Sequence, residues 1–286
     1  MPNFNLSLSP EQIEYVLKPG ITITQAYEVT NNSDNAITIS TEVLAWQPSG
    51  NNGNISYQDV VASPNIIFSL NNADIKLGQT FSLAPKAKQQ LVLKVSSAQE
   101  TSLEDYYYTF FVTQQSQNTN SNNAIGSQAT GKIGSNILLT VSNSENTSIQ
   151  AQINKFTVSP KIKDVFFTPL TFKAEIKNNS QNFFKTKGTI IINKNDLKIK
   201  ELELNDNNVL ANYSRNITCK DQDTCTIQAP FWPGRYTATL KLDESINAPS
   251  ANISFFVFPF SIVAILILFL AIFLTGFKLR KRFIEK

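Results

Sequence analysis

The sequence predicts an all-β protein of two immunoglobulin-like β-sandwich domains, followed by one C-terminal transmembrane helix. Three observations support this prediction. Apolar and polar residues alternate with a period of two along much of the chain, similar features recur in its two halves, and a long uncharged run stands near the C-terminus. Alternation with period two is typical of strands that bury one face. No helical periodicity precedes the uncharged run, so strands and turns are expected before it.

The alternation is clearest in residues 37–45, 170–177 and 236–242, where Ile, Val, Leu, Phe, Tyr or Ala recurs at every second position except Thr41. Turn-forming groups such as Lys18-Pro19-Gly20 separate these runs, as in antiparallel sandwiches. The alternation slips by one residue after Ile199, and we expect a bulge or turn at Lys200-Glu201.

A weak internal repeat predicts the number of domains. Asn31-Asn32-Ser33 and Asn178-Asn179-Ser180 each follow an alternating run, and each half also has a late strand led by tyrosine, at residues 106–112 and 234–240. A tyrosine at that place is either the tyrosine corner of immunoglobulin-like folds or an ordinary core aromatic residue. A polar stretch between the halves sets the boundaries. The first domain is expected at residues 1–145 and the second at 149–253.

The uncharged run from Phe255 to Phe277 is long enough, as a helix, to span a bilayer. Basic residues follow it and are typical of the cytoplasmic side of a span. They are Lys278, Arg280, Lys281 and Arg282. The sequence thus predicts a single-pass protein of the cell membrane, with extracellular N-terminal domains and a basic cytoplasmic tail at 278–286. Residues 1–20 lack the pattern of a signal peptide, which indicates a start upstream of Met1 or a tail-anchored chain.

The composition argues against catalysis. The chain has no histidine, which excludes the usual catalytic triads and histidine-ligated metals. The acidic groups at Glu104-Asp105, Asp206 and Asp221 with Asp223 lack the spacing of a calcium loop and are expected in solvated turns. The sequence therefore predicts no enzyme, no catalytic residue, no cofactor, no metal and no small-molecule substrate.

Charge and cysteine content limit the partners and the redox state. The net charge is only +3, which gives no reason to expect nucleic acid as a partner. Cys219 and Cys225 are the only cysteines, and in an oxidising compartment they are expected to form a disulfide; two free thiols are the alternative.

Four short stretches resemble one known family. Leu8–Ile13, Leu17–Gly20, Val29–Ile39 and Gly53–Tyr57 look like the N-terminal domain of the WxL-interacting proteins of bacterial surfaces. The resemblance implies two immunoglobulin-like domains, a membrane helix and a basic tail. It also implies peptidoglycan binding by the first domain and protein contact by the second.

Two functions follow as hypotheses. The first is a non-enzymatic, membrane-anchored binding protein of the bacterial cell surface that engages cell-wall glycan or another surface protein. The second is a chaperone-like assembly protein that offers a sheet edge to a secreted strand. Such an edge is expected beside a long polar loop between Gln114 and Asn136.

Overall fold

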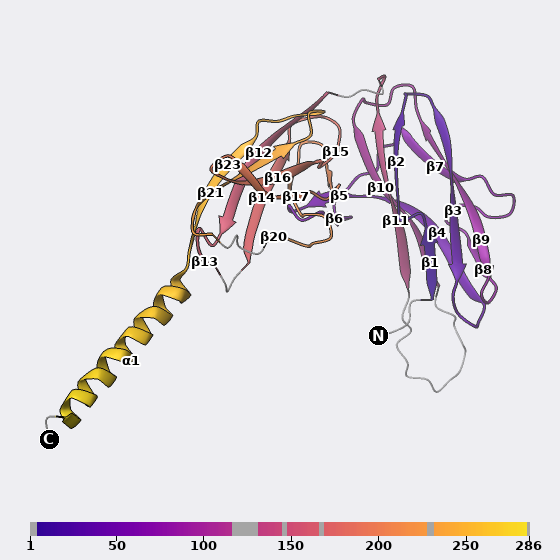
Figure 1. Cartoon of the computed structure of the whole chain (residues 1–286). Coiled ribbons are helices and arrows are strands. Elements are labelled where there is room, and N and C mark those ends of the chain that lie inside the picture. The colour runs from indigo at the N-terminus through magenta and orange to yellow at the C-terminus, as the bar shows by residue number, and fades with distance from the viewer. Residues whose placement is uncertain (1–4, 116–130, 145–147, 166–168, 228–231, 285–286) are drawn as a thin grey trace. The chain divides into compact units, whose positions relative to one another are not determined.

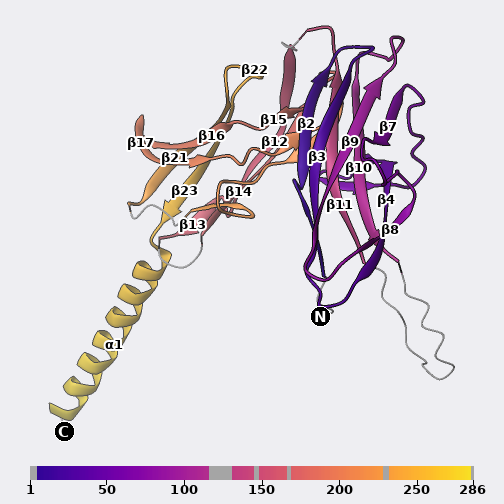
Figure 2. The same cartoon turned by 90° about the vertical axis from the view of Figure 1, so that its right-hand side faces the viewer.

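The computed structural model describes residues 5–115, 131–144, 148–165, 169–227 and 232–284, with side chains as far as residue 276. The chain forms two compact units (Figures 1 and 2). The first comprises Met1–Ser49, Gly53–Ser148 and Gln181–Phe183. The second comprises Gly50–Asn52, Ile149–Ser180 and Phe184–Lys286.

The first unit consists of two main sheets and a small hairpin. One sheet has the order β1-β3-β9-β7, the other has the order β2-β11-β10-β4-β8, and β5 pairs with β6. The strands are β1 (Leu6–Ser9), β2 (Gln12–Leu17), β3 (Thr22–Asn31), β4 (Ile37–Ala45), β5 (Gln47–Ser49), β6 (Asn54–Ser56), β7 (Ile66–Leu70), β8 (Thr80–Leu83), β9 (Lys88–Ser97), β10 (Asp105–Gln114) and β11 (Lys132–Val141).

The second unit repeats this plan. One sheet has the order β19-β14-β12-β22, with β20 also on β14, and the other has the order β13-β23-β21-β16-β17, while β15 pairs with β18. The strands are β12 (Ile149–Ser159), β13 (Ile162–Asp164), β14 (Leu170–Asn178), β15 (Phe184–Lys185), β16 (Gly188–Lys194), β17 (Leu197–Glu203), β18 (Asn208–Val209), β19 (Ser214–Asn216), β20 (Cys225–Ile227), β21 (Gly234–Leu242), β22 (Ile246–Asn247) and β23 (Ala251–Phe258).

Each unit encloses its own apolar core between its two sheets. Alternating residues of the long strands supply it. In β14, for example, Leu170, Phe172, Ala174 and Ile176 are buried while the residues between them are more exposed. The structure thus confirms the all-β prediction, and it does so through the alternation on which the prediction was based.

The first strand of each unit changes sheets at a cis Ser–Pro peptide bond. In the first unit the bond is Ser9-Pro10: β1 before it pairs with β3, and β2 after it pairs in parallel with β11. In the second unit the bond is Ser159-Pro160: β12 pairs with β14, and β13 pairs in parallel with β23. The internal repeat therefore extends to the path of the chain.

One polar feature of the predicted repeat also recurs in space. The Tyr236 hydroxyl donates to Trp232 O at 2.8 Å, and the Tyr106 hydroxyl donates to Ser102 O at 3.3 Å. In both units the tyrosine therefore bonds to the backbone four residues upstream, which is the geometry of a tyrosine corner. The predicted shift in the alternation of β17 corresponds to a bulge. The bulged residue is Ile199, which has no partner on β16, and it lies one residue before the expected Lys200-Glu201.

The prediction of a membrane span is wrong. No helix in the described part of the chain has both the length and the apolar character needed to cross a membrane. The uncharged run is not one element, because Phe255–Phe258 belongs to β23 and the helix α1 begins at Phe260 and ends at Ile284. Phe255 and Val257 are buried in the core of the second unit.

The membrane placement is corrected with it. The span from Phe255 to Phe277, the cytoplasmic tail at 278–286 and the single-pass location all depended on that one run. The side chains of the basic group Lys278, Arg280, Lys281 and Arg282 lie outside the described residues.

Candidate functional site

The last strand of the first unit has an open edge. β10 pairs with β11 along Lys132–Thr140, but β2 pairs only with Asn136–Val141 on the other side. Residues 132–135 of β11 therefore pair with no strand on that side among the described strands. The cause is the change of sheets at Pro10, because the chain before Pro10 pairs with β3 and no longer with β11.

The backbone direction at this edge follows from the ladder. Asn136 N–H donates to Glu11 O, on the side of β2, whereas Gln114 N–H bonds Gly131 O on the side of β10. Successive residues of an antiparallel strand alternate between these two directions. The N–H and C=O groups of Lys132 and Gly134 therefore point away from β10, toward the open side.

Side chains leave this edge accessible. Gly134 has none, and a Cβ there would lie 2.5 Å from Thr109 Cγ2 and 2.8 Å from Phe111 Cε1. The Lys132 side chain is drawn back across the sheet, because its Nζ lies 2.7 Å from Glu42 Oε1 and 3.9 Å from the centre of the Phe111 ring. A lysine that is held in this way does not block the edge, although lysines commonly protect edge strands.

The edge strand β17 of the second unit is protected in the ordinary way. Four of its residues are charged: Lys198, Lys200, Glu201 and Glu203. Lys198 forms an ion pair with Glu201, and Lys220 lies 3.1 Å from Glu203. Such side chains discourage the addition of another strand. The strand β23 of the second unit has a partly open edge, as β11 does, because β13 pairs only with Phe256–Phe258.

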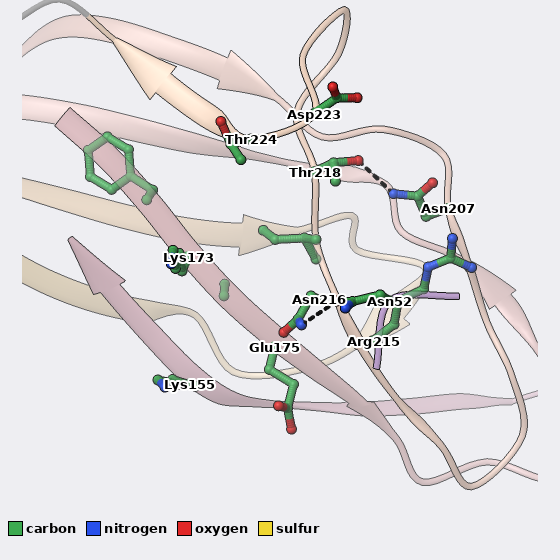
Figure 3. A pocket seen from close by; sticks show the side chains of 13 residues that line it. Asn52, Lys155, Lys173, Glu175, Asn207, Arg215, Asn216, Thr218, Asp223 and Thr224 are labelled. Carbon is green, nitrogen blue, oxygen red and sulfur yellow. Dashed lines mark hydrogen bonds between the residues drawn. The ribbon is translucent and has the colours of Figure 1, made fainter. Parts of the chain in front are cut away.

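The second unit also contains a cavity of about 610 Å³ beside β14 and β19 (Figure 3). Its floor is apolar, with Phe172, Ala174 and Ile217. Its walls are polar and come from segments far apart in the sequence. They include Asn52, Lys155, Lys173, Glu175, Asn207, Arg215, Asn216, Thr218, Asp223 and Thr224.

Hydrogen bonds order the walls of this cavity. Thr218 Oγ1 accepts from both Asn205 Nδ2 and Asn207 Nδ2 at 2.8 Å. Asn216 Nδ2 donates to Asn52 Oδ1 at 2.8 Å, as Figure 3 shows. Arg215 Nη1 donates to Asn208 O at 2.7 Å. Burial lowers the pKa of the Arg215 guanidinium, because burial penalises its charged form.

A disulfide supports the loop at one side of the cavity. Cys219 and Cys225 are bonded, and both are buried. Thr218 directly precedes the loop that they close, and Asp223 and Thr224 lie within it. The two cysteines therefore act on the structure of a wall and not as free thiols.

The predicted acidic groups are not brought together as a metal site; the described residues contain no cluster of carboxylates that could hold a metal ion. Asp105 differs from the prediction of a solvated turn. Burial raises the pKa of its carboxyl, while donors from Asn182, Thr140, Phe183 and Tyr107 act in the opposite direction. It is a structural carboxylate of the first unit.

The sequence analysis missed Gly134 and Arg215. A signal was present for each. A glycine inside a strand marks a close approach of other atoms, and Arg215 is one of only two arginines before the C-terminal helix. Most of the polar loop predicted between Gln114 and Asn136 lies outside the described residues, but its end, from Lys132, is the first part of β11.

No model of a known protein family matches the sequence, and no curated protein matches it. Among solved structures, the chain is similar to the class 5 fimbriae chaperone CfaA, with a TM-score of 0.44, 12% identity, and coverage of 89% of this chain and 100% of that one. It is also similar to the E. coli chaperone DraB, with a TM-score of 0.40, 10% identity and coverage of 88% and 97%.

A third similar structure is the Salmonella enterica SafA pilin in complex with the SafB chaperone. The TM-score is 0.41 and the identity 9%, with coverage of 87% of this chain and 96% of that one. Scores and identities of this size carry no argument about function.

Proposed function

We propose that this protein is a non-enzymatic binding protein whose first unit pairs with an extended segment of another protein at the open edge of β11. The single observation that carries the proposal is the open stretch Lys132–Ser135, whose outward N–H and C=O groups have no partner strand among the described residues. Addition of a strand to such an edge is a common mode of protein recognition.

The open stretch is short, so backbone pairing alone gives little affinity. Each hydrogen bond adds only about 0.5–1.5 kcal/mol net, and only Lys132 and Gly134 direct their groups outward. Side chains of the incoming strand must add apolar contacts. Half-buried Ile133 on the inner face and the Phe111 ring over Gly134 on the outer face offer them. The favoured partner is therefore a strand with apolar side chains beside these two residues.

The contrast with β17 supports this choice of edge. At the proposed edge of β11 the backbone is open and Lys132 is held away by Glu42. Along β17, in contrast, charged side chains protect the edge. The corresponding edge of β23 is a second place where the same partner could add, because Ala251–Phe255 is left uncovered by β13.

Amide hydrogen exchange tests the proposal directly. The probes are ten-residue synthetic peptides that alternate apolar and polar residues, added to the whole chain. Binding at β11 should slow exchange of the Lys132 and Gly134 amides, because their N–H groups would then donate to the peptide. Protection elsewhere, with these two amides unchanged, would reject β11 as the binding edge, and protection at β23 would identify the alternative.

A matched pair of variants separates backbone pairing from side-chain effects. Lys132→Pro removes the outward N–H at the first residue of β11, a place where a strand tolerates proline. Lys132→Ala keeps that N–H but loses the same contacts with Glu42 and Phe111. The proline variant should bind the peptides several-fold more weakly than the alanine variant. Equal binding by the two would contradict strand addition.

Membership of the WxL-interacting family, with peptidoglycan as a ligand of the first unit, stays a prediction. Co-sedimentation of residues 1–145 with purified peptidoglycan, compared with an unrelated β-sandwich, tests it. Recovery no greater than that of the unrelated protein would reject this ligand.

A further inference from the structure

The cavity of the second unit presents an excess of hydrogen-bond donors. Its volume of about 610 Å³ lies within the range of small-ligand sites, about 300–1,000 Å³. Some polar side chains of the lining already form hydrogen bonds with one another. The donors that these bonds leave unused indicate which kind of ligand the cavity can bind.

Thr218 contributes a donor. A threonine hydroxyl has two lone pairs and one proton, and Thr218 Oγ1 already accepts from Asn205 and Asn207. Its own proton is therefore left for an acceptor. The amide of Asn52 behaves likewise, because its Oδ1 accepts from Asn216 and its Nδ2 stays available.

Arg215 is the strongest donor of the cavity. Its guanidinium carries five N–H groups in a planar fork, of which the bond to Asn208 O uses one. No carboxylate of the described residues forms an ion pair with it. Lys155 and Lys173 add two further cations on exposed side chains (Figure 3).

The acidic residues of the cavity do not balance these donors. Glu175 is held by two amide donors, since Oε2 accepts from Asn51 Nδ2 at 3.0 Å and Oε1 accepts from Asn154 Nδ2 at 3.3 Å. Asp223 is exposed, on the disulfide-closed loop. The two carboxylates that line the cavity thus stand against three cations, Lys155, Lys173 and Arg215, so the charge of the lining is positive.

We infer that this cavity binds an oxyanion, carboxylate or phosphate, carried by a larger polar molecule, with Arg215 as the principal contact. Guanidinium groups bind both oxyanions through two parallel hydrogen bonds. The Thr218 hydroxyl and the Asn52 amide would donate to the remaining oxygens or to neighbouring hydroxyls. The cavity is separate from the edge of β11, and the inference does not depend on the proposed function.

Three sugars of matched size test the inference on the whole chain by isothermal titration calorimetry and by ¹⁵N chemical-shift mapping. Glucuronate carries a carboxylate, glucose 6-phosphate carries a phosphate, and glucose carries no charge. At least one of the charged sugars should bind at least about tenfold more tightly than glucose, and should shift the signals of Arg215 and Thr218. The stronger of the two identifies the oxyanion. Equal binding of all three would overturn the inference.

Arg215→Gln removes the charge while it keeps a polar side chain, and it should weaken binding of the charged sugar by about tenfold or more. Arg235→Gln is the matched control, since Arg235 lies on β21, donates to Ser254 at 3.2 Å and does not line the cavity. The control should bind as the unchanged chain does. Equal losses in the two variants would overturn the inference.

The double variant Lys155→Gln with Lys173→Gln covers the case in which Arg215→Gln fails to fold. Both side chains are exposed, so the fold should tolerate their replacement. Loss of both cations should reduce affinity several-fold and reduce the dependence of binding on salt. Unchanged affinity and unchanged salt dependence would contradict an oxyanion site.

Discussion

The Oδ1 atom of Asn178 accepts a hydrogen bond from the backbone N–H of Ser180 at 2.7 Å, and in the first unit Asn31 makes the same bond with Ser33 at 2.9 Å. Both asparagines are fully buried at the end of a strand. Each also uses Nδ2 to hold a neighbouring segment, Val209 O in one unit and Ala84 O in the other. The two side chains thus connect a strand, the turn after it and a segment distant in the sequence.

Asn178→Ala should lower the stability of the second unit by about 1–3 kcal/mol, because it leaves buried donors and acceptors unpaired. Asn179→Ala is the control, since that side chain is exposed and its replacement should change stability by less than about 0.5 kcal/mol. Hydrogen exchange of the second unit in increasing urea measures both. Equal effects of the two substitutions would contradict a special role of the buried amide.

Tyr236→Phe should lower the stability of the second unit by about 0.5–1.5 kcal/mol, the net value of one hydrogen bond. The substitution keeps the buried ring and removes only the bond from the hydroxyl to Trp232 O. Tyr213→Phe, at a residue that is 41% exposed, provides the comparison. A tyrosine corner without energetic value would give the same unfolding midpoint for both variants.

The first unit should lose stability between about pH 10 and pH 12. Burial raises the pKa of Tyr27 to about 12 and likewise raises that of Tyr108 to about 12. Above pH 10 the unfolded chain releases these protons before the folded chain does, so unfolding becomes easier as the pH rises. Fluorescence of Trp46, which is buried in this unit, can follow the transition.

Tyr27→Phe isolates one of these two groups. The variant should show a weaker dependence of stability on pH above 10. At neutral pH the substitution should change the stability of the first unit only slightly. The reason is that the buried Tyr27 hydroxyl and the nearby Ser135 Oγ have no hydrogen-bond partner of normal geometry among the described residues. A large loss of stability at neutral pH would show that this hydroxyl is hydrogen-bonded in solution. An unchanged dependence of stability on pH above 10 would show that it is accessible to solvent.

Replacement of both Cys219 and Cys225 by alanine should lower the stability of the second unit by about 2 kcal/mol, as expected for a disulfide that closes a short loop. Binding of a charged sugar in the cavity should weaken as well, since Thr218 and Thr224 lie beside the two cysteines. Urea unfolding under oxidising conditions compares the variant with the unchanged chain. An equal midpoint would mean that packing alone holds this loop.

Local sequence patterns were sufficient for the strands and for the repeat. The alternation of residues 170–177 predicts β14 because a half-buried strand must place apolar side chains on one face. The two Asn-Asn-Ser stretches and the two late tyrosines predict equivalent places in two domains. This was possible because the turn after each asparagine and the tyrosine corner depend on hydrogen bonds between residues close in sequence. The spacing of Cys219 and Cys225 likewise indicates a short loop.

The same kind of pattern failed at Phe255. An uncharged run has no alternation, so a buried strand and an apolar helix look alike within it. The core of the second unit decides between them: Phe255 and Val257 pack there as part of β23, and the helix starts only at Phe260. The prediction erred because burial against distant strands cannot be read from one segment.

Both candidate sites also depend on tertiary structure. The edge of β11 is open because the chain crosses to the other sheet at Pro10, more than a hundred residues away in sequence. The donors of the cavity come together from Asn52, Thr218 and Arg215, of which only two are close in sequence. Side-chain periodicity reports which face of a strand is buried, whereas strand order and the contacts between distant segments arise only when the two sheets pack.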